Sequence, residues 1–74
     1  MVNNTEKGKA IREEILKVIE EYIKNNGFSP TVRELGAAVG LKSTATIHKH
    51  LDRLKEENKI DWNPTMPRTI TIKL

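Results

Sequence analysis

The residues best suited to chemistry lie between positions 42 and 53 of this 74-residue chain. His48 and His50 are its only two histidines and would be the first candidates for metal ligands. Two positions apart on a helix, they point in different directions, whereas side chains that share one metal ion lie three or four positions apart. The chain also contains no cysteine. We therefore expect neither a metal site nor a cofactor.

Catalysis finds equally little support in this segment. Ser43 and Lys49 are a conceivable nucleophile and base, but nothing in the surrounding sequence supplies an oxyanion hole or a pocket. No glycine-rich phosphate loop is present either. We therefore expect a protein that acts by binding and has no catalytic residues.

The excess of basic charge is confined to the second part of the chain. Overall, 13 Lys and Arg against 10 Asp and Glu give a net charge of +3. Residues 1–27 carry five of each sign and are neutral, whereas residues 28–74 carry eight basic and five acidic side chains. An ordinary solvated surface is one interpretation of this excess. The other is a surface that meets a polyanion.

Three helices are predicted to position these side chains. Residues 7–26 place their apolar side chains at the spacing of one helical face, and Gly27 can close that helix. Residues 31–34 have the capping-box pattern of a helix start, and Gly40 would end this short second helix. Gly36, inside it, costs about 1 kcal/mol relative to alanine, which indicates either a close approach by another helix or a tolerated imperfection.

The third helix is predicted from Ser43, a good N-cap, to residue 57 or 58. Its apolar stripe is Ile47, Leu51 and Leu54. Because a turn of only a few residues around Gly40 separates it from the second helix, the pair has the helix-turn-helix pattern.

An alternating pattern follows the third helix. Residues 59–62 and 69–74 are predicted as two strands, joined by a proline-rich loop at residues 63–68. The sequence thus predicts a mainly α fold with a small β-hairpin, a winged helix-turn-helix in which a two-stranded antiparallel wing follows three helices. A chain of this length fits one domain, residues 1–74.

The outer face of the third helix is the predicted binding surface, because such a helix enters the major groove with its first residues facing base edges. Hydroxyl, imidazole and ammonium groups can bond to base edges, and methyl groups can contact a thymine methyl. An ordinary solvated surface is the alternative. The candidates on this face are Ser43, Thr44, Ala45, Thr46, His48 and Lys49.

Phosphate contacts are predicted for a second set of side chains. The basic candidates are Lys42, Arg53 and, in the wing loop, Arg68. Thr31 begins the second helix, where free amides and the helix dipole favour an anion, although a capping role alone is equally compatible with its position.

Four segments carry a resemblance to the amino-terminal DNA-binding domain of the LexA repressor family, and together they extend over about residues 8–74. The resemblance implies a winged helix-turn-helix that binds operator DNA as a symmetric dimer and represses transcription, typically in the SOS response. It places the base-reading residues on Ser43, Ala45, Thr46, His48 and Lys49. The self-cleaving domain of that family has no counterpart in this chain. The segments are 27–35 (GFSPTVREL), 40–43 (GLKS), 46–51 (TIHKHL) and 63–70 (NPTMPRTI).

The predicted partner is therefore double-stranded DNA, most simply a palindromic operator bound by a homodimer. Two alternatives are a winged-helix protein-interaction module, which would present an apolar or acidic outer face, and a non-specific nucleic-acid or RNA binder. The amino terminus lacks the pattern of a secretory signal, and no apolar run is long enough to span a bilayer. We expect a cytoplasmic location and no membrane partner.

Overall fold

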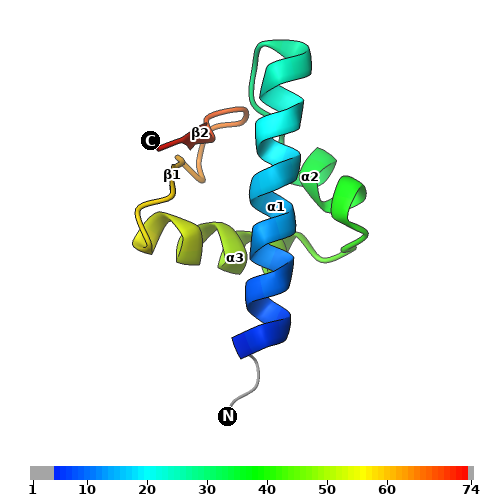
Figure 1. The fold of residues 1–74 in the computed structure, drawn as a ribbon. Helices are drawn as coiled ribbons and strands as arrows, with labels where there is room; N and C mark the ends of the chain where they lie inside the picture. The colour runs from blue at the N-terminus through cyan, green and yellow to red at the C-terminus, as the bar shows by residue number, and fades with distance from the viewer. Residues whose placement is uncertain (1–4, 74) are drawn as a thin grey trace.

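The computed structural model describes residues 5–73, in which three helices precede a two-stranded antiparallel hairpin. α1 stands in the middle of the molecule, with α2 on one side and the hairpin on the other, and α3 crosses its lower half (Figure 1). The predicted fold class is confirmed. The element bounds are α1 Thr5–Asn26, α2 Val32–Val39, α3 Thr44–Glu56, β1 Ile60–Asp61 and β2 Thr71–Ile72.

The starts of α2 and α3 are fixed by the side-chain caps that the sequence predicts. Thr31 Oγ1 accepts a hydrogen bond from the Glu34 amide at 3.1 Å, and Glu34 Oε1 accepts one from the Thr31 amide at 2.9 Å. Ser43 Oγ accepts from the Thr46 amide at 3.3 Å. Gly40 ends α2 in the left-handed conformation, with φ of 76°. Because both caps depend on neighbouring residues, these helices start at the positions expected.

The core joins all the elements through aliphatic side chains and Trp62. The inner stripe of α3, which is Ile47, Leu51 and Leu54, is buried in this core as predicted. The opposite face of α3 therefore points outward. α1, α3 and the hairpin supply most of the buried side chains. The buried apolar residues are Ile15, Ile19, Leu35, Ile47, Leu51, Leu54, Ile60, Trp62 and Ile70.

Gly36 marks the place where the turn between α2 and α3 touches α2. A Cβ atom at this position would lie 2.9 Å from the backbone oxygen of Leu41 and 3.6 Å from Cγ1 of Ile47. The expected close approach is therefore made first by the turn itself and second by α3. This contact sets the short distance between the two helices of the helix-turn-helix.

The hairpin is shorter than the sequence pattern predicts. β1 and β2 are each two residues long and pair in the register Ile60 to Ile72. The loop between them is held by its own side chains, since Asn63 Oδ1 accepts from both the amide and the hydroxyl of Thr65. Leu74, predicted as the end of the second strand, lies outside the described residues, as does the segment 1–4. Within residues 5–73, no helix is long and apolar enough to cross a membrane.

Candidate nucleic-acid interface

The first turns of α3 carry the predicted base-reading residues, and most of these are open to solvent. Ser43, Ala45 and Lys49 are exposed, whereas Thr46 and His48 are half-buried. Ala45 and Lys49 lie four positions apart and so share one side of the helix. The structure therefore keeps the predicted set on one short segment, with two of its members partly covered.

A groove of about 400 Å³ runs beside this segment, between the start of α2, α3 and the wing loop, which we define as residues 63–67. The His48 ring stands edge-on against the Trp62 ring, with centroids 5.1 Å apart and an interplanar angle of 89°. His48 thus has a packing partner that sequence analysis did not identify. The residues that line the groove are Pro30, Thr31, Val32, Arg33, Thr44, His48, Trp62, Pro64, Thr65, Met66, Pro67, Arg68 and Ile70.

Arg68 is held by the protein itself. Its Nη1 and Nη2 atoms donate to Glu34 Oε1 and Oε2 at 3.0 and 3.1 Å. Nη1 also donates to the Ser29 carbonyl oxygen at 3.0 Å and to the Tyr22 hydroxyl at 3.3 Å, and the guanidinium carbon lies 4.9 Å from the centre of the Phe28 ring. These contacts occupy the group that sequence analysis assigned to a phosphate. That assignment stays a prediction, and the geometry gives Arg68 a different task.

The carboxylate of Glu34 accepts hydrogen bonds from three residues, Thr31, Arg68 and Tyr22, of which the sequence pattern predicted only Thr31. The Thr31 amide is the main reason that the pKa of Glu34 falls from 4.5 to about 2, and the Arg68 hydrogen bonds are the second. The hydrogen bond to Tyr22, with that to Glu34 next, raises the pKa of Arg68. Both groups therefore stay charged at neutral pH. The capping box reveals only the contact with Thr31, because the contact with Arg68 joins residues far apart in the sequence.

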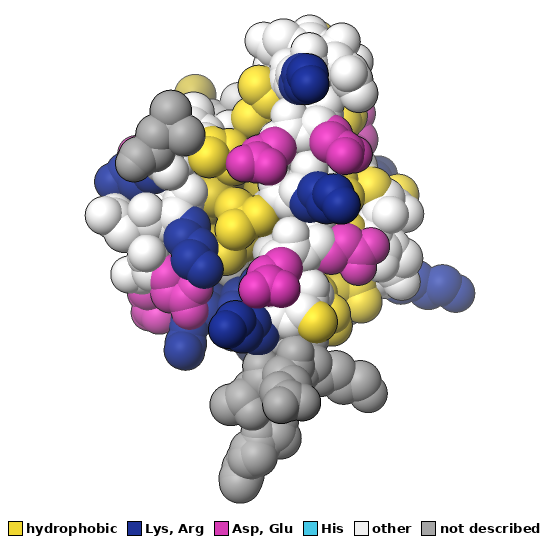
Figure 2. Space-filling view, viewed as in Figure 1, with side chains coloured by type: hydrophobic (Ala, Val, Ile, Leu, Met, Phe, Trp, Pro, Cys, Tyr) yellow, Lys and Arg dark blue, Asp and Glu magenta, His cyan; other side chains and the backbone are white. Residues whose placement is uncertain are grey.

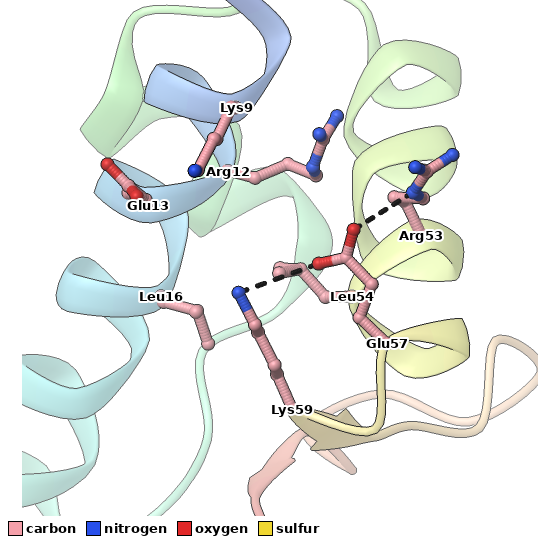
Figure 3. Close-up of a pocket in the computed structure, with 8 residues that line it drawn as sticks. All are labelled: Lys9, Arg12, Glu13, Leu16, Arg53, Leu54, Glu57 and Lys59. Carbon is pink, nitrogen blue, oxygen red and sulfur yellow. Dashed lines mark hydrogen bonds and ion pairs between the residues drawn. The ribbon is translucent and has the colours of Figure 1, made fainter. Parts of the chain in front are cut away.

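Arg53 is turned away from the groove, toward the other end of α3. Its Nε donates to Glu57 Oε2 at 3.0 Å, and Lys59 Nζ lies 3.6 Å from Glu57 Oε1 (Figure 3). These side chains line a separate cleft of about 480 Å³, to which α1 contributes Lys9 and Arg12. The hydrogen bond from Arg53 lowers the pKa of Glu57, with smaller contributions from nearby cations. Arg53 is thus not grouped with the start of α3.

The remaining predicted residues, Thr31 and Lys42, lie at helix starts. Thr31 is half-buried on the groove wall, and Lys42 is exposed immediately before the Ser43 cap. His50 is half-buried, and burial, followed by the charge of Arg12, lowers its pKa. In the described part of the chain, no three histidine or carboxylate side chains are grouped as a metal site would require.

The wider surface is mixed in charge. On the face that shows α1, acidic and basic side chains alternate along the helix, and a band of apolar side chains lies between α1 and the hairpin (Figure 2). The exposed start of α3 differs from that face, because no acidic residue lies between Lys42 and Lys49. An anionic partner would meet less repulsion at the start of α3 than along α1.

Comparison with known proteins agrees with this arrangement. The model of the LexA DNA binding domain matches residues 9–69. The LexA repressor of Shouchella clausii (strain KSM-K16) is 48% identical over 61 residues, which are 82% of this chain and 29% of that protein. The LexA repressor of Exiguobacterium sibiricum is 49% identical over 63 residues, which are 85% of this chain and 31% of that protein. The LexA repressor of Staphylococcus aureus (strain Newman) is 46% identical over 61 residues, which are 82% of this chain and 30% of that protein. The chain thus spans about a third of the length of these relatives, and it belongs to the LexA DNA-binding domain family.

Proposed function

We propose that this chain binds double-stranded DNA in a sequence-specific manner and serves as the DNA-binding part of a transcriptional repressor. Membership of the LexA DNA-binding domain family and relatives named LexA repressor support this proposal. Residues 5–73 share one core, which supports a single binding domain. In this proposal the chain acts in the cytoplasm by binding and without catalysis.

The observation that carries the proposal is the orientation of α3. Its inner stripe is buried, with Ile47 and Leu51 at 0% exposure, so its polar and basic side must face outward. An outward helix start of this kind fits the major groove, which is wide enough to admit an α-helix. We assign base reading to five residues at this start: Ser43, Ala45, Thr46, His48 and Lys49.

The proposed phosphate contacts lie at the starts of α2 and α3. Thr31 lines the groove beside the first amides of α2, and Lys42 lies just before α3. Helix starts attract phosphate through free amides and the helix dipole. Arg53 and Arg68 are left out of this set because Glu57 and Glu34 already hold their guanidinium groups.

One copy provides few phosphate contacts, so tight binding calls for two copies on one site. We propose a homodimer on a palindromic operator, with one α3 in each half-site. The symmetry of such a protein is mirrored by the symmetry of its DNA.

The test is selection of bound duplexes from a random pool, followed by titration of three variants against the selected duplex and a scrambled one. Lys49→Ala is expected to reduce the preference for the selected duplex about tenfold, because a base contact is worth roughly 1–3 kcal/mol. Lys42→Ala is expected to weaken both duplexes equally and to lower the salt slope by about 0.9, the value for one phosphate. Lys17→Ala, an equal charge change on the exposed side of α1, is the control.

Two results would overturn the proposal. A pool that yields no preferred sequence would indicate non-specific binding. Equal losses for Lys49→Ala on both duplexes would remove base reading from the start of α3. A selected site without palindromic symmetry would contradict the dimer and leave the DNA-binding proposal in place.

A further inference from the structure

We propose that Arg68 and Glu34 form a clamp that positions the wing loop beside α2 and so sets the shape of the DNA groove. Arg68 is then a positioning residue for DNA binding, and its guanidinium does not contact a phosphate. This inference deepens the proposed function and rests on it for the part that concerns DNA. The clamp consists of Tyr22, Phe28, Ser29, Glu34 and Arg68.

The clamp joins three parts of the molecule that are far apart in sequence. Arg68 follows the wing loop, Glu34 belongs to the first turn of α2, and Tyr22 belongs to α1. Both carboxylate oxygens of Glu34 accept from Arg68, and the Tyr22 hydroxyl donates to Glu34 Oε1 at 3.1 Å. A two-pronged pair of this kind fixes direction as well as distance. The wing loop therefore cannot move away from α2 while the pair remains closed.

The loop itself is stiff, so its position depends on the points where it is anchored. The Thr69 hydroxyl donates to the carbonyl oxygens of Asn63 and Met66, which closes the loop on itself. Beyond it, the Ile70 amide donates to the buried Ser29 Oγ at 3.2 Å. Ser29 thus accepts two hydrogen bonds, one from the Ile70 amide at its hydroxyl oxygen and one from Arg68 at its carbonyl oxygen. The clamp and the Ile70–Ser29 hydrogen bond together fix the position of residues 68–70, which follow the wing loop.

The backbone at Arg68 supports the same conclusion. Its φ is 56°, in the left-handed region that residues with a side chain seldom adopt. Such a conformation persists where surrounding contacts over-determine it. The guanidinium contacts to Glu34 and Ser29 supply that determination.

Glu34 connects the clamp to the proposed DNA surface. The same carboxylate oxygen, Oε1, that accepts from Arg68 also accepts from the amide of Thr31, on the groove wall. Opening the clamp would therefore disturb the wing and the start of α2 together. This coupling lets two substitutions of opposite charge change distinguish positioning from direct phosphate contact.

The first experiment measures binding to the selected duplex by Arg68→Ala, Glu34→Gln and the double variant. Glutamine preserves the capping bond of α2, because Gln replaces Glu in a capping box. Positioning predicts that each single variant weakens binding about tenfold and leaves the salt slope unchanged. The double variant should lose no more affinity than the single variant with the larger loss, because both substitutions break the same pair. Lys17→Ala and Glu21→Gln make the same charge changes on the exposed side of α1 and should leave affinity as it is.

Direct phosphate contact predicts a different outcome. Glu34→Gln would then tighten binding, because it removes a repelling charge, and Arg68→Ala would lower the salt slope by about 0.9. Either result overturns the proposal. All variants are compared at a temperature at which far-ultraviolet circular dichroism shows them folded, so that loss of stability does not count as loss of affinity.

The second experiment needs no DNA and so separates this inference from the proposed function. Amide spectra and hydrogen exchange of the free protein are compared for wild type, Arg68→Ala and Arg68→Gly. Glycine relieves the left-handed backbone but also removes the guanidinium. We expect both variants to shift and deprotect the Thr31 amide and the three amides of the wing loop, which belong to Asn63, Thr65 and Met66. If glycine restores the wild-type pattern, or if these wing-loop amides do not change in either variant, the clamp is refuted. Should wild type select no duplex, only the proposed function fails, and this comparison still decides the clamp.

Discussion

Replacing Gly36 by alanine should destabilise the domain, although alanine is the better helix former. The new Cβ would lie 2.9 Å from the Leu41 oxygen, and that neighbour is backbone in the turn between α2 and α3. Alanine gains about 1 kcal/mol in helix propensity. Overpacking of a tight contact costs about 1–3 kcal/mol. The difference is a net loss of up to about 2 kcal/mol.

Thermal and urea unfolding measure this difference directly. For a domain of this size, 1 kcal/mol corresponds to a change in Tm of about 4–8 °C. The matched variant is Ala37→Gly, on the exposed side of the same helix, which should lose about 1 kcal/mol through propensity alone. If propensity governed both positions, the two variants would change stability in opposite directions. The structure predicts that both are less stable than wild type.

The substitution should also displace the turn between α2 and α3. To accommodate the methyl group, Leu41 must move, and the amide signals of Leu41 and Ile47 should shift more than those of the hairpin. A Gly36→Ala variant with raised Tm and an unchanged Leu41 signal would refute the tight contact, and with it the reason that Gly36 is required here.

Two further substitutions test the ion pair and the core. Glu34 has a folded pKa of about 2 against 4.5 when unfolded, so its contribution to stability is fully present above pH 4.5 and is lost as pH falls toward 2. Urea unfolding across this range should show a steeper loss for wild type than for Glu34→Gln, and a carboxyl signal of Glu34 that titrates near 4.5 in NMR would contradict the clamp geometry. Leu51→Ala empties a site with no exposed surface and should cost about 2–5 kcal/mol in urea unfolding. A cost below 1 kcal/mol would mean that α3 is not anchored by this stripe.

The helices and their boundaries could be predicted because their determinants are local. The Thr31 and Glu34 capping pair, the Ser43 cap and Gly40 each act within a few residues of the boundary that they fix. The inner stripe of α3 follows from helical spacing alone. These features also fix which side of α3 faces outward, so the candidate surface was accessible from sequence.

The position of the wing could not be predicted from the sequence in this way, because its contacts are not local. Arg68 meets Glu34 across 34 positions and Tyr22 across 46, and no local pattern indicates that this arginine turns toward α2. A left-handed backbone at an arginine gives no sequence signal of the kind that glycine gives. Arg53 has a local partner, because Glu57 lies four positions later and pairs with it along the helix, and the assignment of Arg53 to a phosphate stays a prediction.

Amide shift mapping during titration with the selected duplex tests the central claim most directly. We predict that the largest shifts fall on residues 43–49, at the start of α3, and that amides along the groove beside Thr31 change with them. The contrary result would place the largest shifts on Lys9, Arg12 and Lys59, around the cleft at the far end of α3, while residues 43–49 stay unchanged. That outcome would move the DNA to another face of the domain.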